Sequence, residues 1–516
     1  MPLTKTAISA ILLAFTALCP SCRCRGELQH IGVPAQGHTI EGMGVEFDPH
    51  LWSQNIVMRG VDPTAWDTAY RRVRDMGLKR MRVMIMPAWY EPVNDNEDPE
   101  TADMERFTMN SVEMQSLYRV LDLAEECGAD VTLVMWGCNR TRASVIDTAY
   151  RSDDVYFLAE GNSTQDWCVP STDIGEWCEN ITVALRWLLE TKGYGCIREF
   201  TLMNEPNWSY AIDGKVSPEA YGDMCKALDT RLRKEGLRDK VRFNLSDDAQ
   251  DHDFLRHAVA TVDAVADCYN SHTYLFGYET PDSAIVAWER RNCDITAPTG
   301  KRHFVGEFGS NLTTGASRQS DIDRFERGVL MTRIALSLLN GGAAGVSYWS
   351  LLDQYYAFTD PYEAMQQLGL WRSAKQEYRD NTHCGNIKED FEPRPQYYAY
   401  SLLTRHIPPA SRLHALHTGD EFVQGSAVLS PDGRWIYAFA NGSDRHFEAV
   451  IENRACGNGR FDVYRYTAEN LPDDGPITAS EHTAMRRGTM RVSLAAQTTA
   501  LYVERAAEDG NGRTLF

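Results

Sequence analysis

Two glutamates stand at points where an apolar, strand-like run of residues ends. Glu205 closes the run 200–205 (FTLMNE) and is followed by Pro206, while Glu307 lies in the run 304–309 (FVGEFG). Proline cannot donate to a strand ladder, so Pro206 indicates that a strand stops there. Two carboxyl groups that face one sugar carbon can cleave a glycosidic bond, because one protonates the leaving oxygen while the other attacks or activates water. Glu205 and Glu307 are therefore candidate catalytic residues, although a single strand-end glutamate is more often a surface or ion-paired residue.

Polar and aromatic side chains occur at further predicted strand ends. Those within short motifs are, in chain order, Arg82 in MRV, Asn204 in NEP, His272 and Tyr274 in SHTY, and Trp349 in SYW; Trp136 ends a further predicted strand without such a motif. Each motif is too short to carry weight alone, but together and in this order they are informative.

With these motifs, the sequence resembles the clan A glycoside hydrolases and is most similar to their cellulase-like family 5. In that family an Asn-Glu-Pro at the end of the fourth strand holds the acid/base, and a Gly-Glu-Phe-Gly at the end of the seventh holds the nucleophile. The same motifs occur here at 204–206 and 306–309. The resemblance covers roughly residues 40–395; the run 42–47 (GMGVEF) and the C-terminal region resemble families 30, 39, 51 and 79. It implies a retaining enzyme without a cofactor, with Glu205 as acid/base and Glu307 as nucleophile.

The resemblance places two side chains beside the nucleophile. Arg82 matches the arginine of the second strand, and a guanidinium stays charged and can donate two hydrogen bonds to a carboxylate. Beside Glu307 it is expected to hold that residue ionised, because a nearby opposite charge favours the charged form. Tyr274 is expected to donate its hydroxyl to the same carboxylate.

The other motif residues are expected to contact the sugar or the acid/base. Asn204 can bond the 2-hydroxyl, a contact that strengthens in the transition state. His272 is expected to orient Glu205 or to bond a hydroxyl, and a structural core histidine is the alternative. Trp349 and Trp136 each offer an apolar ring face for a sugar, with core packing as the alternative.

Eight strand-like runs alternate with helix patterns and short turns, which predicts parallel strands covered by helices. They are residues 41–47, 80–86, 130–136, 198–204, 241–245, 264–272, 303–308 and 344–349. Eight such units favour a closed barrel over an open sheet, and no glycine-rich dinucleotide or phosphate-binding fingerprint follows any of them. The long connections 87–110 and 137–174 follow strands and therefore lie on the face where barrel enzymes bind substrate.

The predicted fold is α/β, a (β/α)₈ barrel of the TIM type followed by a smaller antiparallel β-sandwich. After residue 411 the runs become alternating or β-branched and are separated by turn residues, as is typical of a sandwich. We divide the chain into a signal peptide over 1–24, a catalytic barrel over 27–400 and a sandwich over 405–505.

The first residues are typical of a signal peptide. Lys5 supplies a positive charge, and the apolar run 7–18 is too short to span a bilayer. We expect a secreted, periplasmic or cell-surface protein with no transmembrane span. Lipid attachment to Cys19, Cys22 or Cys24 is the alternative to simple secretion.

The net charge of −20 argues against nucleic acid as a partner, since the surface repels phosphates. No Cys or His group has the spacing of zinc ligands, so we expect no metal site and no cofactor. The acidic run 247–253 lacks the glycine and terminal glutamate of an EF-hand loop. We expect a solvated loop there, in which Asp251 caps the next helix.

The expected partner is a β-linked oligo- or polysaccharide, and the first prediction is an endo-β-glucanase. Three alternatives remain open. The first is an exo-acting β-glycosidase on short glycosides, and the second is a catalytically weak carbohydrate-binding protein. The third is a barrel enzyme of different chemistry, such as a metal-dependent hydrolase. The last would need His and Asp pairs at strand ends, and His-x-His is absent from the first strand.

Overall fold

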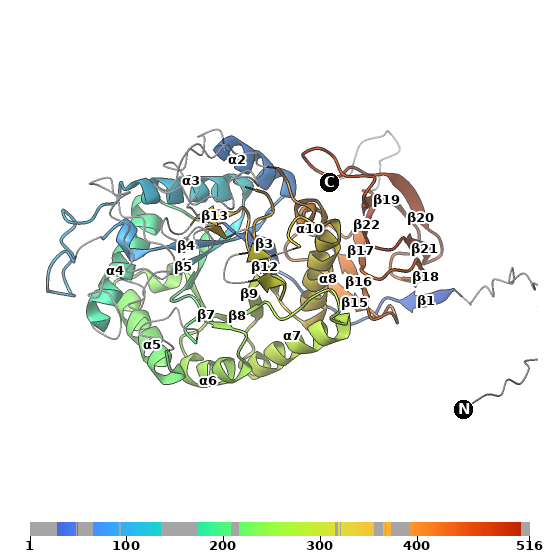
Figure 1. Cartoon of the computed structure of the whole chain (residues 1–516). Coiled ribbons are helices and arrows are strands. Elements are labelled where there is room, and N and C mark those ends of the chain that lie inside the picture. Colours follow the sequence, from blue (N-terminus) through green and yellow to red (C-terminus); the bar gives the residue numbers. More distant parts are fainter. Residues whose placement is uncertain are drawn as a thin grey trace, which may run out of the picture.

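The computed structural model describes residues 28–47, 49, 65–91, 94–135, 173–207, 216–314, 318–319, 321–355, 365–366, 368–372 and 392–506. A closed barrel of parallel strands and its helices form the larger part of the molecule, and mainly antiparallel sheets lie beside it (Figure 1). The barrel strands pair in chain order, and the last pairs with the first: β3 (Gly42–Glu46), β4 (Arg80–Ile85), β5 (Asp130–Met135), β6 (Ile197–Thr201), β7 (Arg242–Ala249), β8 (Cys268–Thr273), β9 (His303–Phe308) and β12 (Gly345–Tyr348).

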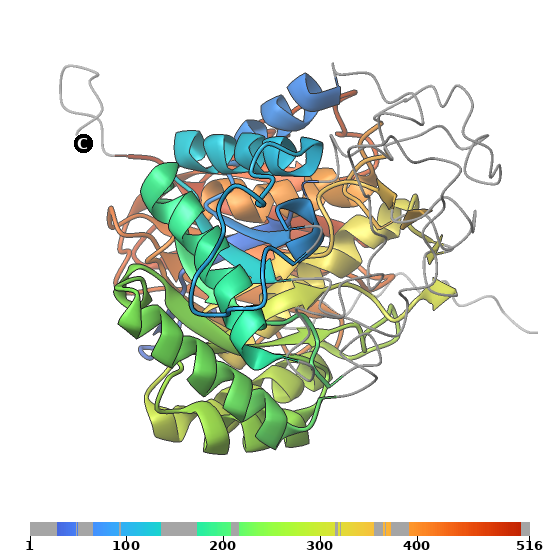
Figure 2. The same cartoon turned by 90° about the vertical axis from the view of Figure 1, so that its left-hand side faces the viewer.

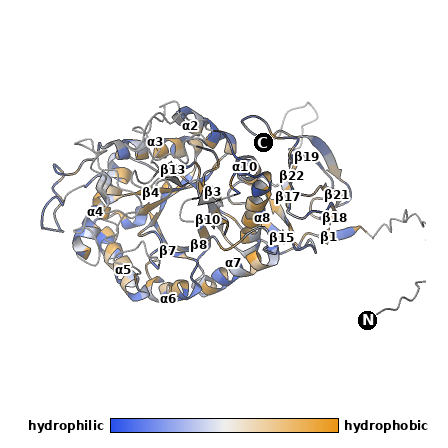
Figure 3. Cartoon of the chain, viewed as in Figure 1, coloured by the Kyte–Doolittle hydropathy of each residue, from blue (hydrophilic) through white to orange (hydrophobic). Residues whose placement is uncertain are grey.

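A helix follows each of these strands and covers the outside of the barrel, which Figure 2 shows from a second direction. In chain order they are α2 (Ala65–Met76), α3 (Val112–Cys127), α4 (Ile174–Arg186), α5 (Pro218–Lys234), α6 (His252–Val262), α7 (Asp282–Thr296), α8 (Phe325–Gly341) and α10 (Pro395–His406). Hydrophilic and hydrophobic residues alternate along these helices, as expected where one face is buried and the other meets water (Figure 3).

Local signals in the sequence explain where these helices begin and end. Ser111 accepts a hydrogen bond from the amide of Met114 at the start of α3, and Gly128 ends the helix with a φ of 58°. A left-handed backbone conformation at this position costs little free energy only for glycine, because glycine has no Cβ. Asp251 caps α6 by accepting from the amides of Asp253 and Phe254, as predicted.

All eight predicted barrel strands are present, and the predicted fold class is confirmed. The strand β7 differs from the prediction, because it extends to Ala249 instead of ending at residue 245. Asp247 and Asp248 are consequently buried, at 0% and 1% exposure. The prediction of a solvated loop was therefore wrong for these two residues, although it was right for the cap Asp251.

The C-terminal part consists of two packed sheets. The larger contains β15 (Arg412–Leu416), β16 (Val423–Leu429), β17 (Trp435–Asn441), β19 (Gly459–Tyr466), β20 (Glu481–Met485) and β22 (Thr498–Glu504), and the smaller contains β18 (Phe447–Glu452) and β21 (Thr489–Leu494). Two strands from before the barrel complete them. β1 (Gln29–Gly32) pairs with β18, and β2 (His38–Thr39) pairs with β15. The sandwich thus includes N-terminal residues that the division at 27–400 assigned to the barrel.

The helix α8 joins the barrel to the sandwich. Asn340 donates to Gln424 (2.8 Å) and to the carbonyl of Gly425 (2.9 Å), and it accepts from Ser426 (2.8 Å). Gln424 in turn donates to Ser337 at 2.7 Å. Among the described residues, no helix combines the length and the apolar character that crossing a membrane requires.

Candidate active site

The site lies at the carboxyl ends of the barrel strands, and Glu307 on β9 is one of its buried carboxylates. Arg82 of β4 donates to one Glu307 oxygen at 2.7 Å, and the Tyr274 hydroxyl donates to the other at 2.7 Å. Tyr274 can lie this close because the neighbouring residue is small: a Cβ on Gly309 would lie 2.8 Å from the Tyr274 ring. Both contacts expected from the sequence are present, and both stabilise an ionised Glu307.

The second glutamate, Glu205, lies just beyond β6 and is bound to His272 of β8. The His272 Nδ1 is 2.8 Å from a Glu205 oxygen and 3.6 Å from Glu307. One carboxyl oxygen of Glu205, one of Glu307 and one His272 nitrogen all lie within 4.8 Å of one another. Glu205 has a φ of 44°, and its amide donates to the carbonyl of Asp247 at 3.1 Å. This unusual backbone is held by neighbours on the next strand, as is common at functional sites.

Arg82 connects the site to two carboxylates, Glu46 and Asp247, that the sequence had not indicated as site residues. Besides Glu307, its guanidinium donates to Glu46 of β3 (2.9 Å), to Asn204 (2.8 Å) and to Asp247 of β7 (2.9 Å). Asp247 also lies 3.1 Å from the Nε2 of His272. Asp247 is therefore the link between the arginine beside one glutamate and the histidine beside the other. The only signal for it in the sequence was its place just after a predicted strand.

The charges of this cluster control its protonation. Burial lowers the pKa of His272, but the carboxylates of Glu307 and Asp247 outweigh burial and raise it well above the usual range of histidine. Burial raises the pKa of Glu307, and the charges of His272 and Arg82 oppose that rise. Burial also raises the pKa of Glu46 to about 8, despite the attraction of Arg82. A charged His272 donates from both ring nitrogens, to Glu205 and to Asp247.

Of the two tryptophans predicted to stack on a sugar, the structure describes only Trp349. Trp349 directly follows β12, and its amide donates to the carbonyl of Phe308 at 3.1 Å. It is 5% exposed, and the peptide bond to Ser350 is cis. Its stacking role stays a prediction. Trp136 lies outside the described residues, as does the predicted signal peptide over 1–24.

Glu205, His272 and Glu307 are close enough to share a metal ion. The geometry instead pairs each of them with another protein group, and Arg82 brings a fixed positive charge to 2.7 Å from Glu307. A cation at this point would be repelled by that guanidinium. The arrangement is suited to moving a proton and attacking an electrophile, with one carboxylate for each task.

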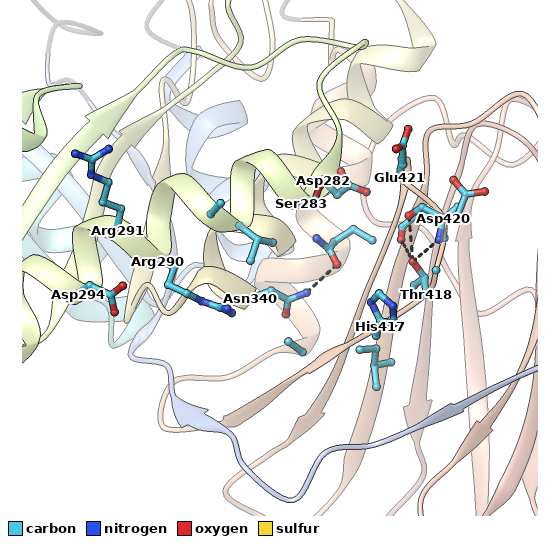
Figure 4. Close-up of a pocket in the computed structure, with 17 residues that line it drawn as sticks. Asp282, Ser283, Arg290, Arg291, Asp294, Asn340, His417, Thr418, Asp420 and Glu421 are labelled. Carbon is cyan, nitrogen blue, oxygen red and sulfur yellow. Dashed lines mark hydrogen bonds between the residues drawn. The ribbon is translucent and has the colours of Figure 1, made fainter.

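A separate cavity of about 690 Å³ lies where α7 meets the segment that joins β15 and β16 (Figure 4). Charged residues such as Asp282, Arg290 and Glu421 line it together with apolar ones such as Val286 and Leu416. No tryptophan, tyrosine or phenylalanine belongs to the described residues that line it, so it lacks the large ring faces on which a sugar stacks. It shares no residue with the cluster around Glu205 and Glu307.

No protein-family model matches the chain, and no curated protein matches its sequence. Solved structures match its fold over nearly the whole length. The family 30 subfamily 8 xylanase from Clostridium acetobutylicum gives a TM-score of 0.60 at 12% identity, covering 92% of this chain and 99% of that one. An endo-β-1,6-glucanase gives 0.58 at 13% identity and covers 94% of each chain. A family 39 β-xylosidase from Caulobacter crescentus gives 0.57 at 13% identity, with 92% and 99% covered.

These likenesses extend over both the barrel and the C-terminal sheets, because they cover more than nine tenths of each chain. They confirm the predicted fold, a barrel with an appended sandwich. Two of the matched structures are, by their names, members of families 30 and 39. Both are among the four families that residues 42–47 and the C-terminal region resemble.

Proposed function

We propose that this chain is a retaining β-glycoside hydrolase in which Glu205 is the acid/base and Glu307 the nucleophile. The observation that supports this most is the approach of their carboxyl oxygens to within 4.8 Å. Retaining enzymes hold the two carboxyl groups about 5–5.5 Å apart, whereas inverting enzymes leave about 6.5–9.5 Å for a water. The matched folds belong, by their names, to a xylanase, an endo-β-1,6-glucanase and a β-xylosidase.

In the first step, a Glu307 oxygen attacks the anomeric carbon and the bond to the leaving oxygen breaks. Glu205 gives its proton to that oxygen, and a glycosyl ester forms on Glu307. Arg82 and Tyr274 each hold one Glu307 oxygen, so they orient the carboxylate for attack. His272 donates to Glu205 at 2.8 Å and keeps the acid in place while its charge changes.

In the second step, water replaces the leaving group. Glu205 takes a proton from this water, the water oxygen attacks the anomeric carbon, and the ester bond to Glu307 breaks. Two inversions at the same carbon give overall retention. Asn204 is positioned by Arg82 at 2.8 Å, which leaves its amide nitrogen to meet a sugar hydroxyl.

We further propose a β-linked polysaccharide as substrate and place β-glucan first, with xylan as the second candidate because of the matched xylanase fold. A neutral polymer suits a chain with a net charge of −20, since it meets no repulsion. The predicted signal peptide supports action outside the cytoplasm, as a secreted, periplasmic or lipid-anchored enzyme.

The experiment is hydrolysis of a panel of β-glucans, xylans and aryl β-glycosides by wild type, Glu307→Gln and Glu205→Gln. We expect the first variant to lose about 10⁴-fold or more of kcat/KM and the second about 10²–10⁴-fold. Glu469→Gln, an exposed carboxyl of the sandwich, is the matched control and should behave as wild type. Full activity in either catalytic variant, or no cleavage of any substrate by wild type, would overturn the proposal.

Retention itself is checked by following the anomeric configuration of the first product by proton NMR. A β-configured product that later mutarotates supports double displacement. An α-configured first product would show inversion and would remove Glu307 from the role of nucleophile.

A further inference from the structure

A second group of buried carboxylates lies outside the catalytic cluster. It consists of Asp95, in the long connection after β4, and Glu176 and Glu179, in the first two turns of α4. One side-chain oxygen from each lies within 4.8 Å of the others. The three residues are buried, with 0%, 4% and 1% exposure. Residues three apart share one helix face, so both glutamates point the same way.

Within the described part of the chain, Glu176 and Glu179 each have an oxygen that lacks the partner a buried charge requires. Glu176 Oε2 and Glu179 Oε1 have no hydrogen-bond donor in the described part of the chain. The nearest described arginine, Arg231, is ion-paired with Glu235 and Glu100 and not with these glutamates. Asp95 differs, because its carboxylate accepts from the Asn96 amide (2.8 Å), the Asn96 side chain (2.9 Å) and the Asp103 amide. The guanidinium of Arg231 acts on Glu179 from a distance but donates to Pro99 (2.6 Å) and Glu235 (3.1 Å). An unpaired buried charge is costly, so the cluster is short of positive charge.

A fourth carboxylate, Glu91, lies beside the cluster and has hydrogen-bond donors of its own. Glu91 accepts from the Asp95 amide at 3.2 Å and from the Asn180 side chain at 2.7 Å. Burial raises the pKa of Glu179 to about 8, and the charges of Asp95 and Glu176 contribute to the rise. The described protein groups thus leave one oxygen of Glu176 and one of Glu179 buried and without a donor.

We propose that Asp95, Glu176 and Glu179 bind a divalent cation of the calcium type, which joins the connection after β4 to the start of α4. The donor set is made of carboxylate oxygens only, which hard cations prefer over zinc or copper. Ca²⁺ takes ligands at about 2.3–2.6 Å, so oxygens up to about twice that distance apart can share one ion. Burial favours Ca²⁺ over Mg²⁺, which gives up its waters reluctantly.

At this position the ion would stabilise the loops around the active site. The connection 87–110 follows β4, which carries Arg82, and α4 follows β5, so both begin on the face that holds Glu205 and Glu307. The ion would fasten two neighbouring segments of that face. Cysteine and histidine spacing could not reveal such a site, because its ligands are oxygens from residues about eighty positions apart.

The test uses the full chain after treatment with a chelator and removal of the chelator. Calorimetric titration with CaCl₂ should show one bound Ca²⁺ per chain, and Ca²⁺ should raise the melting temperature by about 2–5 °C. Glu179→Gln and Asp95→Asn should weaken binding by about tenfold or more, because affinity follows the number of charged ligands. Glu219→Gln is the matched control, since it removes an acidic charge from the first turn of α5.

Tb³⁺ luminescence gives a measurement that does not depend on the variants folding. Tb³⁺ bound to wild type should be excited through Trp177, which follows Glu176 in α4, and Ca²⁺ should displace it. No heat of binding in millimolar CaCl₂ would overturn the proposal, as would a folded Glu179→Gln that binds Ca²⁺ as tightly as wild type. A Glu179→Gln protein that is more stable than wild type, with no response to Ca²⁺, would show that the carboxyls share a proton instead.

Discussion

At the scale of single residues, Arg82 has the largest set of partners in the site. Its guanidinium meets oxygens of Glu46, Asn204, Asp247 and Glu307, which come from four different strands or strand ends. Lysine has one ammonium on a flexible stem and cannot replace this planar fork. Glu307 is therefore positioned by Arg82, and Arg82 is in turn held in place by Glu46, Asn204 and Asp247.

Replacing Tyr274 with phenylalanine is predicted to shift the acid limb of the pH profile upward. The hydroxyl donates to Glu307 at 2.7 Å and favours the ionised carboxylate. Burial raises the pKa of Glu307, and the Tyr274 hydrogen bond opposes that increase. Without the hydroxyl, the pKa of Glu307 therefore rises further. Since only ionised Glu307 attacks, the acid limb of kcat/KM should move to higher pH by about one unit. An unmoved limb with a lower rate would instead assign Tyr274 to substrate binding.

At the scale of elements, the extension of β7 to Ala249 decides how the site is built. It brings Asp247 into the barrel interior, where the side chain lies 2.9 Å from Arg82 and 3.1 Å from His272. The next residue, Asp248, accepts from the Asp251 amide at 2.9 Å, and Asp251 caps the start of α6. The turn from β7 to α6 thus supports the catalytic face through its own hydrogen bonds.

Removing the cap of α6 is predicted to loosen the start of that helix. Asp251→Ala deprives the amides of Asp253 and Phe254 of their acceptor, which lies 3.0 Å from each. The cost is about 1 kcal/mol, the usual effect of losing such a cap. Hydrogen exchange should show faster exchange at these two amides. Asp251→Asn keeps a good cap and should exchange as wild type does; equal protection in the alanine variant would contradict the assignment.

At the scale of the whole molecule, the sandwich is tied to the barrel from several directions. Strands β1 and β2 enter its sheets before the barrel begins, and α8 hydrogen-bonds to β16 through Asn340. On another side, Arg72 of α2 donates two hydrogen bonds to Asp474, at 3.1 and 3.0 Å. The barrel and the sandwich are therefore expected to resist unfolding together.

The Arg72–Asp474 contact is predicted to stabilise the protein at neutral pH but not in strong acid. Burial raises the pKa of Asp474, but hydrogen bonds from Arg72 and Arg71 outweigh it and hold the pKa at about 2. An unfolded aspartate titrates near 4, so the stabilisation is complete above about pH 4 and is lost as the pH falls to about 2. Because the Asp474 side chain is 33% exposed, solvent screening reduces the gain to about 1 kcal/mol.

Asp474→Asn tests this directly. Its melting temperature should fall below that of wild type at pH 7, and the difference should shrink toward pH 2. Asp473→Asn removes the neighbouring exposed charge and serves as control. A difference that persists unchanged at pH 2 would mean that packing, not the ion pair, causes the effect.

What could be predicted from the sequence was local in origin. The alternation of strands and helices, the cap Asp251 and the stop at Gly128 depend on consecutive residues, so they are visible without a structure. Glu205 and Glu307 could be found because a strand end in a parallel barrel always lies on one face. The resemblance then supplied the expectation that Arg82 and Tyr274 lie beside Glu307.

Contacts between distant residues were decided only by the tertiary structure. Arg82 and Asp247 are 165 positions apart, and they meet because closure of the barrel and the length of β7 bring them together. The same holds for β1, which finds its partner β18 across the whole barrel, and for Asp95 with Glu179. A local pattern contains no information on the register of strands or on which helix lies beside which loop. Only packing settles these, and so only packing revealed Asp247 and the second acidic cluster.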